Sequence, residues 1–412
     1  MEHRVVITGM GAVTPLGLDL NETWDSAKAG KCGIGPLTLY DCSEMKVRIA
    51  GEVRGFEPEK YMEKREIRKN DRCVQFALAA SQEALAMSGL DMEKEDPYRC
   101  AIFLATGIGG ITTIQADTER AHEKGYDKIS PFFIPMTITN MSAAVVAIKF
   151  GFKGMCTCPV SACAAGANAV GDALRHLRHG YAEVALCGGT EAAITALGMG
   201  GFTSMHALTD ASDPMRASIP FDKERSGFVM GEGSGMLVLE TLEHAEARGA
   251  KILGEVVGYG STCDAHHITA PDPEGRGGAA AMTQAVQDSG IAPTDVQYIN
   301  AHGTSTPLND KGETLAIKSA FGAHAYKLMV SSTKSMTGHL LGASGAVEAI
   351  LCAKALEEGF VPPTIGYQVP DEDCDLDIVP NEGRKAELKY AVSNSLGFGG
   401  HNASLVLKKW EG

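Results

Sequence analysis

A lone cysteine lies in a segment of short side chains that could carry nucleophilic chemistry. Cys163 falls within Val160–Ala169, and a helical pattern follows it as far as Gly180. The spacing predicts that Cys163 sits near a helix N-terminus, where aligned peptide dipoles favour a thiolate and free N–H groups can bind an oxyanion. For this segment alone, one more buried structural cysteine is the alternative interpretation.

Three later segments carry polar groups that could act with such a nucleophile. His302 ends a strand pattern and enters a polar loop, and loops of this kind often hold catalytic residues. Lys334 and His339 precede a second helix rich in Gly and Ala, as Cys163 precedes the first. A glycine loop around Phe398 leads into the last strand pattern. Each segment alone is weak evidence for catalysis. His302 by itself, for example, would more often be a surface or capping histidine.

The elements that must position these groups alternate between strands and helices. Residues 72–87 place apolar side chains at helical spacing, with Asn70 or Asp71 as the cap and Gly89 as the terminator. Such alternation predicts an α/β fold with a largely parallel sheet. The predicted strands are 4–8, 101–105, 183–187, 235–239, 251–259, 328–331 and 404–407.

A weak internal repeat appears when the chain is compared with itself at the offset that aligns Gly166 with Gly345. Both copies read as small residues that enter a helix, one beside Cys163 and the other beside His339. This pattern suggests two duplicated α/β halves that face each other across one site. Chance matching of two Gly/Ala-rich segments is the alternative. The other matched pairs are Ala167 with Ala346, Leu177 with Leu356 and Gly180 with Gly359.

The composition excludes several classes of function. The 412 residues include 37 Lys and Arg against 51 Asp and Glu, a net charge of −14 that repels nucleic acid and anionic lipid. No stretch approaches the roughly 18 apolar residues that a membrane span needs. The 11 cysteines are scattered without the spacing of a disulfide framework. We therefore expect a soluble, cytoplasmic protein that binds neither nucleic acid nor membrane.

In this order and at these distances, the four segments resemble those of the elongating β-ketoacyl-acyl carrier protein synthases of type II fatty-acid synthesis, in the thiolase superfamily. The resemblance runs from Val5 to the last strand, and the Cys–His–His set separates these enzymes from thiolases and from initiating synthases. It implies a thiolase-like α/β fold whose two similar halves pack as a layered α-β-α-β-α sandwich. Residues 1–250 would form the half with the nucleophilic cysteine, and 251–412 the half with two catalytic histidines.

The resemblance also implies a reaction. Malonyl-acyl carrier protein would condense, with loss of CO2, with an acyl group held on Cys163, so that a fatty acid grows by two carbons. The backbone N–H groups of Cys163 and Phe398 would bind the oxyanion, and Phe398 would also act as a gate. His302 and His339, as neutral imidazoles, would stabilise the enolate, and Lys334 would order this half of the site.

Further residues match substrate and ion sites of the family. No cofactor is required, but a structural monovalent or divalent cation is expected as one interpretation of an oxygen-rich group, and a buried polar network without an ion is the other. The substrate-binding positions are Ile108, Phe202, Thr304, Thr306 and Gly399. The group that would hold the cation is Asn300, Glu348, Ser393 and Asn394.

The expected partners are a second copy of the chain, as a homodimer, and an acyl carrier protein loaded with acyl or malonyl phosphopantetheine. A basic cluster in this acidic chain suits an acidic carrier, although a solvated helix face is the alternative. Two departures from relatives stand out: the residues around Cys163 are smaller and more apolar, and His206 replaces an arginine that commonly faces the carrier. The predicted docking residues are Lys64, Arg65, Arg68 and Lys69, supported by Lys124 and Lys128.

Other functions fit the motifs less well. Gly9-Met10-Gly11 is followed by Thr14 where a dinucleotide fingerprint needs glycine, and neither 231–235 nor 342–345 has the Gly-x-Ser-x-Gly spacing of a serine hydrolase. Within the resembled family, a non-catalytic chain-length partner would lack Cys163. A polyketide synthase with the same Cys–His–His set is the nearest rival.

Overall fold

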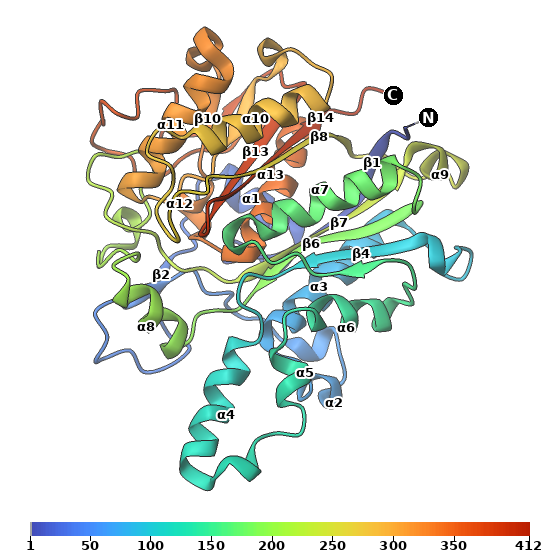
Figure 1. Cartoon of the computed structure of the whole chain (residues 1–412), viewed down its shortest axis with the longest axis vertical. Helices are drawn as coiled ribbons and strands as arrows, with labels where there is room; N and C mark the ends of the chain where they lie inside the picture. Colours follow the sequence, from blue (N-terminus) through green and yellow to red (C-terminus); the bar gives the residue numbers. More distant parts are fainter. Residues whose placement is uncertain (1) are drawn as a thin grey trace.

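A computed structural model describes residues 2–412 and places ten strands in one large sheet, in the order β10-β9-β13-β14-β8-β1-β7-β6-β4-β5 (Figure 1). The strands of the first half are β1 (Val5–Val13), β4 (Cys100–Ala105), β5 (Cys156–Thr157), β6 (Val184–Glu191) and β7 (Gly233–Thr241). Those of the second half are β8 (Gly254–Cys263), β9 (Tyr298–Asn300), β10 (Met329–Ser331), β13 (Tyr390–Gly397) and β14 (His401–Lys408).

The same strand order is found on both sides of the contact between β8 and β1, when it is read outward from that contact. Outward from that contact, β1-β7-β6-β4-β5 corresponds to β8-β14-β13-β9-β10. The directions correspond as well, because in each half the first two pairings are antiparallel and the next two are parallel. Two similar α/β halves are therefore present, as the sequence predicted.

The prediction of a largely parallel sheet was wrong, since four of the nine pairings are parallel and five are antiparallel. Parallel neighbours need a long crossover connection, usually a helix. β13 and β14 are instead joined by the tight glycine loop around Phe398, which permits only an antiparallel pair. The predicted strands themselves are all present, and most of them extend beyond the predicted ends.

Helices form three layers around the two halves of the sheet. α7 (Ala165–Arg178) and α13 (Ser344–Glu358) lie in the middle, where they contact each other and strands of both halves (Figure 1). α13 is buried almost all round, because most of its side chains are apolar or small. The outer helices are α3 (Arg72–Ser88) and α6 (Met141–Phe150) on one side and α10 (Arg276–Asp288) and α11 (Pro307–Phe321) on the other.

The two central helices meet at the glycines of the sequence repeat. A Cβ on Gly166 would lie 2.7 Å from the carbonyl oxygen of Gly342, and a Cβ on Gly345 would lie 2.6 Å from the amide nitrogen of Ala167. A tight turn precedes each helix, and its first residue has positive φ in both copies, +51° at Ala162 and +47° at Leu341. The offset that aligns Gly166 with Gly345 therefore relates equivalent parts of the two halves.

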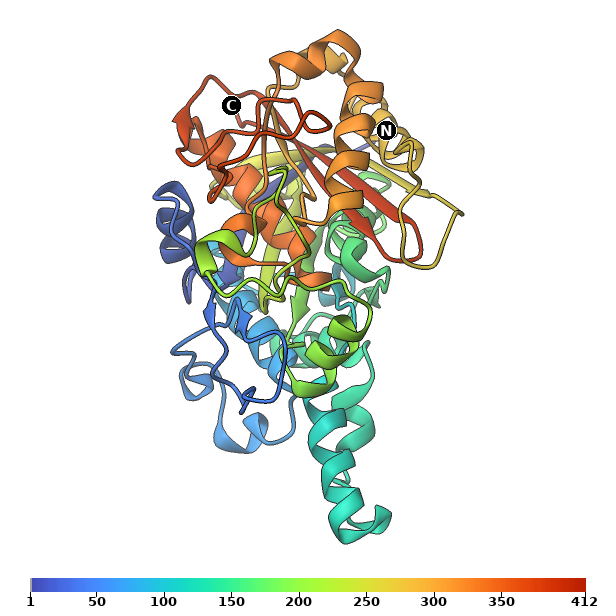
Figure 2. The same cartoon turned by 90° about the vertical axis from the view of Figure 1, so that its left-hand side faces the viewer.

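The remaining helices lie outside these layers. α4 (Ile111–Lys124) projects from the body as an arm (Figure 2), and α5 (Phe133–Thr137) follows it. α3 begins at its predicted cap Asp71 and ends at Gly89, which has φ of +65°. No helix within residues 2–412 is both long and apolar enough to span a membrane. The shorter helices are α1 (Leu20–Lys28), α2 (Lys64–Ile67), α8 (Ala196–Ser204), α9 (Leu242–Ala247) and α12 (Lys334–Thr337).

Candidate active site

Cys163 lies in a single tight turn, Ala162–Ala164, directly before α7. The turn begins at Ala162 with φ of +51°, a conformation that a residue with a side chain rarely adopts. It brings Cys163 to the seam between the halves, where Gly397 of β13 packs so closely that a Cβ there would lie 3.2 Å from the amide nitrogen of Cys163. Cys163 therefore stands at a helix N-terminus, as predicted.

The surroundings of the Cys163 sulfur shift the pKa of its thiol in opposite directions. Burial raises the pKa of the thiol to about 12, against the lowering effects of Lys334 and of the N–H groups of Phe398 and Cys163 itself. The loss of hydration outweighs the dipoles and the nearby cation, so the shift runs opposite to the one expected from the helix N-terminus alone. The two N–H groups are nevertheless the pair expected to bind an oxyanion, and both lie within hydrogen-bonding reach of the sulfur.

The two predicted histidines meet edge to face. His302 follows β9 and His339 follows α12, and their ring centroids are 5.2 Å apart at an interplanar angle of 85°. Nδ1 of His339 accepts the N–H of Leu341 at 3.3 Å and lies 2.9 Å from Ser344 Oγ. Since Nδ1 is an acceptor, the ring proton belongs on Nε2, which is left without a partner in the protein.

Both imidazoles are neutral at ordinary pH. Burial lowers the pKa of His302 and of His339 well below the usual 6.5, and the charge of Lys334 lowers both further. Lys334 is itself buried and forms a close ion pair with Glu348. Burial raises the pKa of Glu348 to about 7, although Lys334 acts in the opposite direction. Burial, together with the nearby charge of Lys334, therefore keeps both histidines unprotonated.

One cavity of about 420 Å³ brings the predicted groups together. Phe202 and Phe398 lie 6.2 Å apart between ring centroids on its wall, and the hydroxyls of Thr304 and Thr306 are 2.9 Å apart. Ile108 belongs to the apolar cluster that contains Cys163 and Phe202, rather than to the cavity wall. The cavity is lined by Cys163, His302, His339, Thr304, Thr306 and Phe398, among others.

Gly397 and Phe398 of the glycine loop line this cavity, whereas the predicted Gly399 lies outside its wall. Gly399 has φ of +85°, which favours glycine, and its N–H donates to the carbonyl oxygen of Ile268 at 2.8 Å. Asp264 N–H donates to the carbonyl oxygen of Gly400 at 2.9 Å. The loop that carries Phe398 is therefore held by the chain segment after β8.

Sequence reasoning missed two buried carboxylates that hold the site's backbone. Glu313 accepts the N–H groups of His302 and Gly303, both at 2.8 Å. Glu191 accepts the N–H groups of Gly107 at 2.7 Å and Gly342 at 3.0 Å. An acidic residue at the end of an otherwise apolar strand, as in Cys187-Gly-Gly-Thr-Glu191, was the available signal.

All four residues of the oxygen-rich group predicted to hold a cation are buried. Glu348 Oε2 and Ser393 Oγ have no hydrogen-bond partner in the protein. Asn394 donates to Glu313 at 3.2 Å and accepts from Ser404 at 2.9 Å, and Asn300 pairs weakly with Thr333. Two orphaned buried oxygens fit a hard cation. Within residues 2–412, no three His, Cys, Asp or Glu side chains are grouped to hold a metal.

The predicted docking residues lie apart from the cavity. Lys64 and Arg65 begin α2, Arg68 and Lys69 follow it, and all four are exposed. Lys69 Nζ lies 5.0 Å from the ring centroid of Phe132. Lys124 and Lys128 are exposed near the end of the α4 arm, and His206 lies on the cavity wall.

A thiol between two oxyanion donors and two neutral imidazoles can exchange acyl groups and stabilise an enolate, so fold and site together define a thiolase-fold condensing enzyme. Sequence models of the beta-ketoacyl synthase N-terminal and C-terminal domains match residues 2–245 and 253–368. The chain belongs to the beta-ketoacyl synthase family.

Relatives of this family match the chain over its full length. A 3-oxoacyl-(acyl-carrier-protein) synthase 2 of Synechocystis is 51% identical over 100% of this chain and 99% of its own. One of Staphylococcus aureus is 50% identical over 99% of both chains. Among solved structures, a type II PKS acyl-carrier protein in complex with its ketosynthase bound to the hexaketide is similar with a TM-score of 0.92, 34% identity and full coverage of both chains.

Proposed function

We propose that this chain is a 3-oxoacyl-(acyl carrier protein) synthase that elongates acyl chains by two carbons, with Cys163 as the nucleophile. The observation that carries the proposal is that Cys163, His302 and His339 line one and the same cavity, with two N–H groups at the sulfur. The full-length relatives that share half of its residues support the fatty-acid reaction over the polyketide one.

The first half-reaction transfers the acyl group. The sulfur of Cys163 attacks the thioester carbonyl carbon, and the bond from that carbon to the carrier's sulfur breaks. The carrier leaves as a thiol and takes the proton that Cys163 gives up. The N–H groups of Cys163 and Phe398, which lie at the sulfur, are the donors that stabilise the oxyanion formed on the thioester's carbonyl oxygen.

The second half-reaction forms the new carbon–carbon bond. Malonyl thioester loses its carboxylate as CO2, and the electron pair remains as an enolate on the thioester. His339 Nε2–H and His302 donate hydrogen bonds to the enolate oxygen of that thioester. They can do so because both rings are neutral and buried. The enolate carbon then attacks the acyl carbon, and Cys163 leaves as a thiolate and is protonated again. No step is a redox reaction, so none of them requires a redox cofactor.

Intact-mass analysis tests this function. The protein is mixed with acyl-carrier thioesters of several chain lengths, and malonyl-carrier is then added. We expect an adduct on Cys163 that clears with release of CO2 and a product two carbons longer. An adduct that persists after malonyl-carrier is added would contradict condensation, and the absence of any adduct would favour a non-catalytic partner.

We propose that an acyl carrier protein docks on the basic cluster Lys64, Arg65, Arg68 and Lys69. These side chains are exposed on a protein of net charge −14, and a family member has been solved with its carrier. Charge reversal at Arg68 and Lys69 should raise the KM for acyl-carrier about tenfold, with little change for a small pantetheine thioester. Lys94→Glu, elsewhere on the surface, is the matched control. Equal losses with both substrates would contradict docking here.

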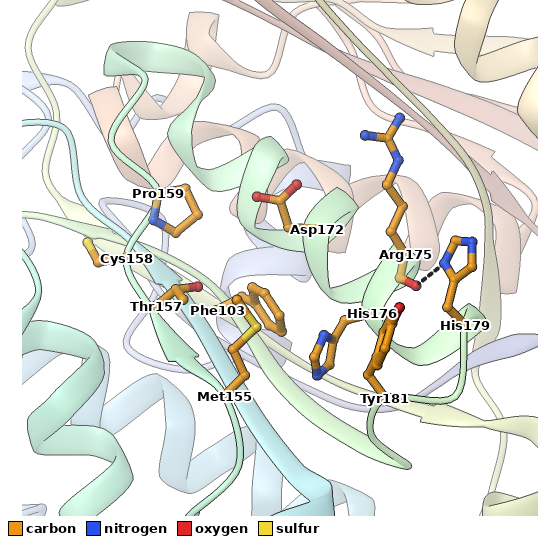
Figure 3. Close-up of a pocket in the computed structure, with 10 residues that line it drawn as sticks. All are labelled: Phe103, Met155, Thr157, Cys158, Pro159, Asp172, Arg175, His176, His179 and Tyr181. Atoms are coloured by element: carbon orange, nitrogen blue, oxygen red, sulfur yellow. Dashed lines mark hydrogen bonds between the residues drawn. The ribbon is translucent and has the colours of Figure 1, made fainter.

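We propose that the protein is a homodimer that pairs through β5. This strand is one of the two edge strands of the sheet, the other being β10, and beside it lies a second cavity of about 460 Å³ lined by apolar and charged side chains (Figure 3). Figure 3 shows Met155 beside Phe103 and Tyr181 beside His176, and the exposed fractions of Met155 and Tyr181 are 48% and 69%. An open edge strand next to exposed apolar side chains suits self-association about a twofold axis.

Light scattering of size-separated protein tests the dimer. Wild-type protein should have the mass of two chains, and Met155→Arg should shift it toward one, because a charge would be buried in the contact. Met87→Arg, at another exposed methionine, should leave the mass unchanged. A wild-type mass of one chain would contradict the proposal.

We propose that a structural cation binds the group of Asn300, Glu348, Ser393 and Asn394, supported by the orphaned oxygens of Glu348 and Ser393. In buffer freed of small cations, added K⁺ or Mg²⁺ should raise the melting temperature of the wild type but not of Ser393→Ala. Equal responses of both proteins would indicate a buried network without an ion.

We also propose the division into halves at 250/251, supported by the mirror-related strand order, and a cytoplasmic location, supported by eleven free cysteines. Separate expression of residues 1–250 and 251–412 tests the division, because two soluble fragments that associate are expected and two insoluble ones would contradict it.

A further inference from the structure

A chain of hydrogen bonds joins the residue two places before the nucleophile to the other half of the fold. The hydroxyl of Tyr259, on β8, donates to Asn168 Oδ1 at 2.7 Å. Asn168, on α7, donates from Nδ2 to Ser161 Oγ at 2.5 Å. The three side chains lie outside the wall of the catalytic cavity. Any effect they have on the reaction therefore passes through the backbone that carries Cys163.

The backbone of this turn needs support from outside. Ala162 has φ of +51°, which its side chain disfavours, so surrounding contacts must hold the conformation. Within the turn, the N–H of Ala164 donates to the carbonyl oxygen of Ser161 at 3.1 Å. The side chain of Ser161 gives the turn a second anchor, through Asn168.

The equivalent turn of the second half shows why the first needs a different anchor. In the internal repeat, Cys163 corresponds to Gly342, whose N–H donates to Glu191 Oε2 at 3.0 Å. The N–H of Cys163 faces its own sulfur instead, and it must remain available for the oxyanion. A carboxylate that bound the N–H of Cys163 would block the oxyanion site. The turn at Cys163 therefore cannot be held in the way that Glu191 holds the turn at Gly342.

Tyr259 is well suited to be the fixed end of this chain. The residue is buried, and its ring packs on Gly171 of α7, where a Cβ would lie 2.4 Å from the ring. The guanidinium of Arg175 lies 4.4 Å from the ring centroid. Burial also raises the pKa of Tyr259 to about 12, so the hydroxyl keeps its proton and donates. Because β8 belongs to the second half, the chain couples the nucleophile turn to the half that carries the histidines.

We propose that Ser161, Asn168 and Tyr259 are positioning residues that hold the nucleophile turn in the conformation needed for acyl transfer. The inference rests on the proposed function, because it takes Cys163 as the residue that is acylated. Since the chain supports the Cys163 turn and not the histidines, loss of the chain should slow acylation and spare malonyl decarboxylation.

Single-turnover kinetics of Tyr259→Phe test the proposal, because only one oxygen is removed. Acylation of Cys163 by an acyl-carrier thioester should slow about tenfold, the usual effect of one lost hydrogen bond at a functional site. Decarboxylation of malonyl-carrier, measured separately, should remain within about twofold of the wild type. Ser161→Ala should behave like Tyr259→Phe, whereas Ser161→Thr, which keeps the hydroxyl, should restore acylation.

Tyr298→Phe provides the matched control, because it also removes a buried hydroxyl, here one that lies 2.9 Å from Ser331 Oγ. It should not slow acylation selectively. Wild-type acylation in Tyr259→Phe, or equal losses in both half-reactions, would overturn the positioning role. Absence of any adduct on wild-type protein would instead contradict the proposed function, and with it this inference.

Discussion

Cys163→Ala should reduce condensation on the order of 10⁴-fold or more, because no other thiol lines the cavity to carry the acyl chain. Intact mass should show no acyl adduct after incubation with acyl-carrier. Malonyl decarboxylation should persist, since His302, His339 and Lys334 remain in place. Cys187→Ala, a buried cysteine of β6, is the matched control and should retain turnover. Substantial condensation by Cys163→Ala would rule out this nucleophile.

The reactivity of the thiol gives an independent check on the same residue. Burial raises the pKa of Cys163 to about 12, so the thiol form predominates at neutral pH. Alkylation of Cys163 by iodoacetamide should therefore accelerate steadily as pH rises, with no plateau below about 10. A plateau near neutral pH would show a preformed thiolate and would restore the expectation drawn from the helix dipole.

His302→Ala and His339→Ala should each slow malonyl decarboxylation about 10²- to 10³-fold, as expected for loss of one donor to a developing negative charge. Acyl transfer to Cys163 should fall much less, because its oxyanion is bound by backbone N–H groups. The two half-reactions are measured separately, by CO2 release and by adduct formation. His324→Ala, outside the cavity, is the control. Equal losses in both half-reactions would contradict these roles.

The pH dependence of decarboxylation follows from the same histidines. Their pKa values lie well below 6.5 in the folded protein, so the neutral donors persist as pH falls through 6.5. Activity should be lost only at lower pH, when the imidazoles take up a second proton and the site gains charge beside Lys334. Loss of decarboxylation already at the ordinary histidine pKa would show that burial does not control these groups.

Local signals in the sequence were sufficient to locate the elements that carry the chemistry. Cys163 and His339 were placed before helices because runs of small residues precede a helical pattern in both cases, and the structure puts tight turns there. The helix 72–87 was recognised from its cap and its terminating glycine. The internal repeat predicted two duplicated halves, and the structure adds that its glycines, which have no side chain, let the two central helices approach closely.

Properties that depend on the surroundings could not be predicted in the same way. The direction of the Cys163 pKa shift depends on how completely the folded chain excludes water, and the dipole argument included only one of the competing effects. The mixed sheet depends on which strands become neighbours. Glu191 and Glu313 were missed because the backbone groups that each carboxylate binds lie far away in sequence or in a loop of undetermined path.

The cavity lies between the two similar halves of the fold, and this position affects how its side chains are held in place. The distance from the sulfur of Cys163 to the imidazoles depends on how one half is seated on the other, and not only on local side-chain rotamers. The contact at Gly166 and Gly345 leaves no room for a Cβ on either residue, so the two central helices cannot slide past each other. The alignment of the catalytic side chains therefore depends on the rigidity of the whole fold.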